Sequence, residues 1–139
     1  MAYEVRSILK QVGYQVRSQT GEYTVLADEP VRAGGTAAAP NPVQYLLVAL
    51  NSCLAITAES IAKNHPEIKL EKFEIVTTGK VKRFADKTSK IAAINVHFNL
   101  HTVLAPKEVK TFINSVIKYC TIHSSLDPDI QFNFEIEYL

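Results

Sequence analysis

The sequence predicts a single α+β domain over residues 1–139. Three observations support this prediction: apolar residues alternate with polar ones near both ends of the chain, a long and nearly continuous apolar segment follows the first third, and a later segment repeats its apolar residues with a helical period. Hydrophobic residues make up 47% of the chain and charged residues 21%, which is typical of a globular protein. The net charge of +1 argues against a dedicated nucleic-acid-binding protein.

The first third of the chain is expected to form strands. Apolar residues occupy alternate positions over residues 12–17 and again over 23–27, and Thr20-Gly21 between them is typical of a turn. Asp28-Glu29-Pro30 ends this hairpin, and a loop of small residues follows over 33–40.

A long helix is expected from Asn41-Pro42 to about Asn64. Asn is a favoured N-cap residue, and Pro is tolerated at the first helical position because its missing N–H has no partner there. The middle of this helix is apolar on nearly every face, so it must be covered on all sides. We expect a sheet on one side and a second helix or a second subunit on the other.

The remaining elements complete an α+β order. Apolar residues alternate over 73–81 and 94–100, with a polar turn at 85–89, which predicts a hairpin. A second helix begins near Pro106, and its apolar face holds Val109, Phe112, Ile113, Val116, Ile117 and Cys120. After a short turn, residues 130–138 alternate strictly and predict a last strand.

The composition also predicts the compartment. Residues 1–6 are partly charged and contain no apolar signal segment. The uncharged apolar stretch 43–58 is shorter than the roughly 20 residues that span a bilayer. Two cysteines are too few for a secreted disulfide scaffold, and their separation fits no zinc spacing. We therefore expect a cytoplasmic protein with reduced thiols.

Cys53 and Cys120 are the residues with the most reactive side chains. Cys53 lies in the apolar middle of the long helix, where a small buried side chain is one interpretation and a nucleophile is the other. The helix N-terminus is too distant to lower the pKa of Cys53, and burial raises it, so a reactive Cys53 would need a cation. Cys120 also points inward, and a nucleophilic thiol with a second thiol nearby suits peroxide reduction.

Two segments of the sequence resemble the OsmC/Ohr family (osmotically induced protein C and organic hydroperoxide resistance protein). The first comprises Gly34-Gly35 and residues 39–56, a Gly-rich loop and an Asn-Pro helix start that lead to Cys53 in a Leu/Ala-rich run. The second, residues 120–126, is similar to the family motif Cys-Pro-Val/Ile-x-x-x-Leu.

The resemblance implies an intertwined homodimer, in which antiparallel-rich sheets wrap around long central helices. It also implies a thiol peroxidase for organic hydroperoxides that needs no cofactor, is regenerated by an external dithiol reductant, and uses Cys53 as the peroxidatic and Cys120 as the resolving thiol. Arg32 matches a position where family members keep an arginine beside the thiolate, although an exposed loop residue is an equal interpretation. Gln44 and Tyr45 are assigned to substrate binding, with a core role as the alternative for Tyr45.

The sequence departs from the family at two positions. Val43 and Gln44 stand where family peroxidases usually have a Glu that holds the arginine, and a neutral Gln supplies no charge for that purpose. Thr121 stands where Pro is usual. These departures motivate an alternative function, a non-catalytic protein of the same fold that binds an apolar small ligand.

Other candidate sites are weaker. His97 and His101 share a strand face but lie about 13 Å apart, too far for one metal ion, so no metal site is expected. His123 follows Cys120 by three residues, and a position near the site is one interpretation, with a surface residue at a helix end as the favoured one. The lysines near the hairpin turn are interpreted as a solvated face that could at most contact an anion or RNA weakly. A hot-dog thioesterase is set aside because that fold lacks the second amphipathic helix.

Overall fold

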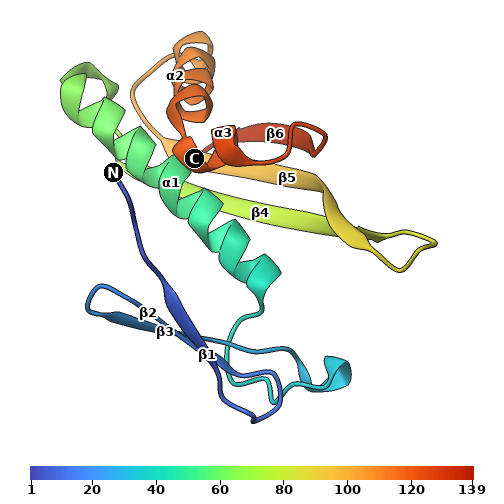
Figure 1. Ribbon diagram of the computed structural model, residues 1–139. Coiled ribbons are helices and arrows are strands. Elements are labelled where there is room, and N and C mark those ends of the chain that lie inside the picture. The colour runs from blue at the N-terminus through green and yellow to red at the C-terminus, as the bar shows by residue number, and fades with distance from the viewer. The chain divides into compact units, whose positions relative to one another are not determined.

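The computed structural model describes all residues, 1–139, as two compact units (Figure 1). The N-terminal unit covers residues 1–46 and the C-terminal unit covers residues 47–139, and each is described by itself. The long helix α1 (Pro42–Asn64) begins in the first unit and continues in the second. Both units mix strands with helical segments, so the predicted α+β class is confirmed. The single domain predicted over 1–139 stays a prediction.

The N-terminal unit is built on an antiparallel sheet of β1 (Arg6–Leu9), β2 (Val16–Thr20) and β3 (Tyr23–Ala27). The predicted hairpin is β2–β3, with Gly21 in its turn at a φ of 56°. β1 was not predicted, and residues 12–14, expected to begin a strand, instead belong to the turn between β1 and β2. Positive φ angles at Gln11 and Gly13 reverse the chain there, because no extended strand contains such angles.

Asp28 organises the loop that leads to α1. Its carboxylate is 1% exposed and accepts hydrogen bonds from three loop N–H groups, those of Glu29 (2.8 Å), Thr36 (3.1 Å) and Ala38 (3.1 Å). It also accepts from the Thr36 hydroxyl at 2.5 Å and from the Tyr14 N–H at 3.2 Å. These bonds, the Thr36 hydroxyl first, hold the pKa of Asp28 well below its usual range although burial acts in the opposite direction.

The helix α1 has the bounds that the sequence predicts. Asn41 and Gln44 form a reciprocal cap: the Asn41 side-chain oxygen accepts from the Gln44 N–H at 2.9 Å, and Gln44 Oε1 accepts from the Asn41 N–H at 2.8 Å. The Tyr45 hydroxyl donates to the carbonyl oxygen of Leu26 in β3 at 2.5 Å. The first turn of α1 is thereby fixed to the sheet of its own unit.

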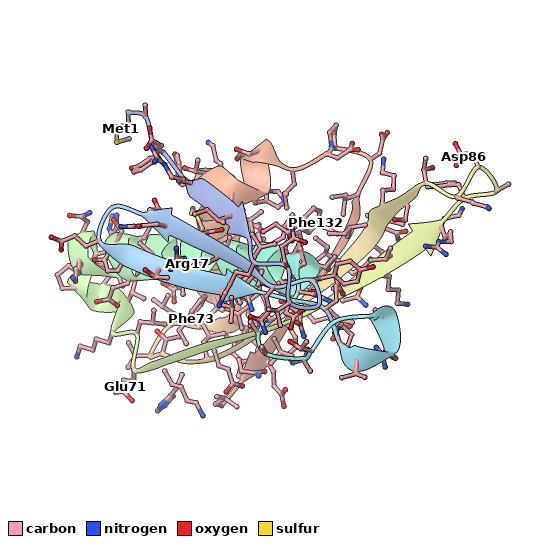
Figure 2. All side chains as sticks on the ribbon, turned by 60° about the horizontal axis from the view of Figure 1, so that its bottom comes forward. Met1, Arg17, Glu71, Phe73, Asp86 and Phe132 are labelled. Carbon is pink, nitrogen blue, oxygen red and sulfur yellow. The ribbon has the colours of Figure 1, made fainter.

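The C-terminal unit contains a second sheet, of β4 (Lys72–Arg83), β5 (Ser89–His101) and β6 (Gln131–Tyr138). β4 and β5 are antiparallel and follow the short helix η2 (Pro66–Ile68); Asp86, labelled in Figure 2, lies at the tip of their hairpin. β6 is parallel to β5, and parallel strands need a crossover, which α2 (Pro106–Tyr119) and α3 (Thr121–Ser125) supply.

Two details of this unit differ from the prediction. A register shift between Lys80 and Val81 interrupts the alternation in β4, and Val81, expected to share the inner face with Phe73, is 53% exposed. The turn expected after Cys120 contains the short helix α3. The other strands and α2 occur where the sequence predicts them.

The core of the C-terminal unit lies where α1 and α2 pack against its sheet. From β5 come the alternating residues that the sequence predicts to face inward. The buried apolar residues from β5, α1 and α2 are Ile94, Val96, Phe98, Leu100, Leu50, Leu54, Ala58, Val109, Phe112, Ile113 and Val116.

One face of α1 lacks a covering layer. Val48 is 55% exposed and Ile56 is 70% exposed, two turns apart on the same side of the helix. By length and composition alone α1 could cross a membrane, with 23 residues and a mean hydropathy of 1.5, whereas the sequence predicts a stretch too short to do so. One such helix is weak evidence, because the central helix of a water-soluble protein passes the same test.

Candidate functional site

The structure brings the two cysteines together in the C-terminal unit. Cys53 lies half-buried in α1, and Cys120 lies fully buried between α2 and α3. Both are free thiols, and each lies close enough to the other to shift its pKa. Two residues far apart in the sequence thus form one sulfur pair.

The backbone conformation around Cys120 determines the position of its side chain. Cys120 is an extended residue (φ −77°, ψ 109°) between two helices, and its N–H still donates to the carbonyl of Ile117 at 3.3 Å. Its sulfur accepts from the His123 N–H at 3.4 Å, and its carbonyl accepts from the Ser124 N–H at 3.0 Å. The bend at Cys120 directs the next backbone N–H groups toward Cys53.

The pKa of Cys53 lies below its ordinary value. Burial raises it, but hydrogen bonds from the Ile122 N–H, the Cys120 thiol, the Thr121 N–H and the Thr57 hydroxyl together lower it more. The Thr57 hydroxyl has a single proton and also lies 2.7 Å from the Cys53 carbonyl oxygen, a better acceptor than a thiol. The backbone N–H groups and the Cys120 thiol are therefore the main stabilising donors.

Cys120 has the opposite character. Burial raises the pKa of Cys120 to about 11, and its hydrogen bond with Cys53 and the nearby negative charge act in the same direction against the N–H of His123. When the pair loses a proton, that proton therefore comes from Cys53 before Cys120. A thiolate beside a second sulfur can act as a nucleophile and then form a disulfide.

The donors at Cys53 differ from what the sequence suggests. The residues predict that a reactive Cys53 needs a cation, whereas none of its hydrogen-bond donors is a charged side chain. Backbone N–H groups occur in every residue except proline, so the residue types in the sequence do not indicate which of them act as donors. The one signal in the sequence is Thr121, because a proline at that position would have no N–H to donate.

Arg32, Gln44 and Tyr45 belong to the N-terminal unit. Arg32 is exposed in the short helix η1 (Val31–Ala33). The Gln44 oxygen accepts from the helix cap and the Tyr45 hydroxyl donates to β3, so both polar groups have structural partners. Their predicted roles toward Cys53 and the substrate stay predictions.

The histidines have partners of their own. His97 lies between Glu135 and Glu137, with each ring nitrogen 3.1 Å from a carboxylate oxygen, and His101 Nδ1 lies 3.0 Å from Glu71. No group of three or more His, Cys, Asp or Glu residues is arranged to hold a metal ion.

His123 differs from the prediction of a surface residue, because it is half-buried. Its ring lies 4.7 Å from that of Phe132, and burial lowers the pKa of His123. Phe132, labelled in Figure 2, also stacks on Phe134. The ring of His123 is thus part of an aromatic cluster, while its backbone N–H contacts the Cys120 sulfur.

Comparison with solved structures shows the fold. An OsmC-like protein from Mycoplasma pneumoniae aligns over 100% of this chain and 98% of its own, with 22% identity and a TM-score of 0.88. An organic hydroperoxide resistance protein from Elizabethkingia anophelis aligns over 100% and 97%, with 11% identity and a TM-score of 0.82. The organic hydroperoxide resistance protein OsmC from Legionella pneumophila aligns over 99% and 97%, with 16% identity and a TM-score of 0.75.

Comparison at the level of sequence identifies the family. No curated protein matches the chain. The family model for OsmC-like proteins matches residues 33–135, a range that begins in the Gly-rich loop and includes both cysteines and the segment between them. The resemblance that the motifs around Cys53 and Cys120 suggest is thus confirmed, and the chain belongs to the OsmC-like protein family.

Proposed function

We propose that this protein is a thiol peroxidase that reduces organic hydroperoxides, with Cys53 as the peroxidatic residue and Cys120 as the resolving residue. The observation that supports it most is the thiol pair: Cys53 has a lowered pKa, and the sulfur proposed to resolve its oxidised form already lies beside it. Membership of the OsmC-like family and the fold shared with organic hydroperoxide resistance proteins agree with this role.

The first step oxidises Cys53. The thiolate attacks the terminal oxygen of the hydroperoxide, an S–O bond forms, and the O–O bond breaks. Cys53 becomes a sulfenic acid, and the alkoxide leaves as an alcohol after it takes a proton. The Cys120 thiol is a suitable proton donor, because its raised pKa keeps it protonated until a strong base forms beside it.

The second step joins the two sulfurs. The Cys120 thiolate attacks the Cys53 sulfur, a disulfide forms, and the hydroxyl group of the sulfenic acid leaves as water after it takes a proton from solvent. An external dithiol then reduces the disulfide with two electrons and restores both thiols. A cytoplasmic location, where such reductants are abundant, is part of the proposal.

Three residues outside the pair are included in the proposal. Arg32 is proposed to add a positive charge near the thiolate, and Gln44 and Tyr45 are proposed to line the substrate pocket. The exposure of Arg32 agrees with a side chain free to reach a partner. Gln44 and Tyr45 use one polar atom each for structure, which leaves the Gln44 amide NH₂ and the Tyr45 ring for substrate contacts.

A second copy of this chain is proposed to cover the exposed face of α1. The apolar residues Val48 and Ile56 on that face, with Ser52 between them, suit close helix packing better than contact with water. The same cover would explain why an all-apolar helix has only Leu50, Leu54 and Ala58 buried.

Stopped-flow measurement of cumene hydroperoxide consumption by the reduced protein tests the activity. We expect one equivalent to be consumed rapidly by the wild type and by Cys120→Ser, and none by Cys53→Ser. Equal rates for wild type and Cys53→Ser would exclude the mechanism. A chain that binds an apolar molecule with equal affinity after Cys53→Ala, and consumes no hydroperoxide, would instead indicate the non-catalytic alternative.

A further inference from the structure

We infer that His123 is a positioning residue for the resolving thiol: its ring, packed against phenylalanines of β6, keeps its backbone N–H directed at the Cys120 sulfur. The inference deepens the proposed function, on which the role of Cys120 as the resolving residue rests. It gives the imidazole ring a role through packing alone, with no proton transfer by its nitrogens.

The first support is the hydrogen bond to the sulfur. The His123 N–H donates to Cys120 Sγ, with 3.4 Å between nitrogen and sulfur. His123 is the third residue of α3, where an N–H has no carbonyl partner within the helix. Cys120 is fully buried, so the donor reaches a sulfur that water does not solvate. A donor in such a place favours the thiolate, and it opposes the burial that raises the pKa of Cys120.

The second support is the packing of the His123 ring. Its centroid lies 4.7 Å from that of Phe132 and 5.9 Å from that of Phe134, and both contacts are edge-to-face. The rings of Phe132 and Phe134 stack on each other at 5.7 Å. The Phe134 ring in turn lies 6.2 Å from that of Phe98, which is completely buried. A continuous row of rings thus connects His123 to the core.

The third support is that α3 depends on its side-chain contacts. It has five residues, and a helix of that length is not stable by itself. Only Ile122 and His123 are half-buried in it, whereas its other three residues are exposed. Burial lowers the pKa of His123, so the ring is neutral at pH 7 and a phenyl ring is a suitable replacement. Loss of the ring should let the turn, and the N–H with it, move away from Cys120.

The consequence concerns the second step of the proposed reaction. Cys120 must lose its proton before it attacks the Cys53 sulfur, and its raised pKa leaves few thiolates at neutral pH. A donor held at the Cys120 sulfur increases that fraction. We therefore expect the His123 N–H to accelerate the attack by Cys120.

The test is the reaction of the full-length reduced protein with one equivalent of dithiobis(nitrobenzoate), followed by the absorbance of released thionitrobenzoate. In the first phase the Cys53 thiolate attacks a reagent sulfur, a mixed disulfide forms, and one thionitrobenzoate leaves. In the second phase the Cys120 thiolate attacks the Cys53 sulfur, the protein disulfide forms, and a second thionitrobenzoate leaves. The second phase therefore measures the attack by Cys120 and requires no hydroperoxide.

Three changes at position 123 separate the ring from the N–H. An amide-to-ester replacement removes the N–H and keeps the ring; a synthetic peptide of residues 120–139, ligated at Cys120, supplies it in the full-length chain. It should slow the second phase about threefold to tenfold at pH 7 and change the first by less than about twofold. His123→Ala should slow the second phase equally, and adding the ester to His123→Ala should slow it no further. His123→Phe should match the wild type.

An unchanged second phase in the ester chain would overturn the inference. So would an ester that slows the His123→Ala chain by the same factor again, a His123→Phe chain as slow as His123→Ala, or a wild type without a second phase. If His123→Ala fails to fold, as judged by its thermal transition, Phe132→Leu replaces it with the same expected results. A protein that shows these differences but consumes no hydroperoxide would support the inference while it refutes the proposed function.

Discussion

The thiols of Cys53 and Cys120 lie beside each other and have opposite acid–base properties. The pKa of Cys53 is lowered by its donors, whereas burial raises the pKa of Cys120 to about 11. A thiol that ionises more readily than an ordinary cysteine is thus adjacent to a thiol that stays protonated at neutral pH and becomes a nucleophile only after it gives up its proton.

The first prediction concerns selective alkylation at pH 7. At this pH only about one Cys120 in ten thousand is a thiolate, and Cys53 ionises at lower pH than an ordinary thiol. A brief treatment with iodoacetamide should therefore modify Cys53 and leave Cys120 free, and the rate at Cys53 should level off at a lower pH than that of a model thiol. Equal modification of both peptides would contradict this assignment.

The second prediction concerns the donor role of Cys120. Cys120→Ala removes the hydrogen bond to Cys53 and should slow Cys53 alkylation at neutral pH by up to about tenfold. Cys120→Ser keeps a donor of similar size and serves as the matched control, with a rate within about threefold of the wild type. After hydroperoxide treatment both variants should retain a sulfenic acid at Cys53, detectable with dimedone. Prompt loss of the sulfenic acid in both variants, seen as the absence of dimedone labelling at Cys53, would show that Cys120 is not the residue that resolves it.

The third prediction concerns Asp28 and pH. The lowered pKa of Asp28 means that its carboxylate stabilises the fold above its ordinary pKa of 3.8, and that this contribution is lost as pH falls below it. Asp28→Asn should therefore lower the denaturation midpoint by a constant amount from pH 7 to about pH 5, and by progressively less as pH falls below 3.8. Exchange of the loop amides at Thr36 and Ala38 should accelerate in the variant, and a midpoint difference independent of pH would contradict the role given to the charge.

The fourth prediction compares two glycines of the N-terminal unit. A Cβ at Gly35 would lie 1.9 Å from the Glu29 carbonyl oxygen, so Gly35→Ala must displace the loop that Asp28 organises. At Gly21 nothing lies within 4 Å, and Gly21→Ala should cost only the left-handed φ, about 1 kcal/mol. Urea unfolding should show a distinctly larger loss for Gly35→Ala; similar losses would mean that the loop yields easily.

The fifth prediction concerns the proposed homodimer. Ile56→Glu places a charge in the middle of the exposed apolar face of α1 and should convert a dimer of twice 15.5 kDa into a monomer, measured by sedimentation equilibrium. Glu59→Gln, at an exposed polar position of the same helix, should leave the dimer intact. A wild-type chain that sediments as a monomer would exclude the proposed cover.

The sequence predicts the elements whose patterns are long and regular. The Asn-Pro start and the Pro66 stop define α1, and strict alternation defines β5 and β6. β1 is not predicted, because Arg6–Leu9 is short and exposed along its length and no face of it has an apolar pattern. The short helix α3 likewise has no periodicity to detect.

The candidate site is predictable only in part. The inward positions of Cys53 and Cys120 can be expected from the two helices, and the structure brings them together. The donors at Cys53 could not be expected, because Thr121 and Ile122 act through backbone N–H groups that every residue except proline has. Asp28 likewise resembles an ordinary turn residue until its hydrogen bonds with the loop are known.

Disulfide formation tests the central claim most directly. One equivalent of cumene hydroperoxide added to the reduced protein should yield a chain lighter by two hydrogen atoms, and peptide mass spectrometry should find Cys53 linked to Cys120 of the same chain. A protein that keeps both thiols free after this treatment, or that gains oxygen at Cys53 without the link, would contradict the account.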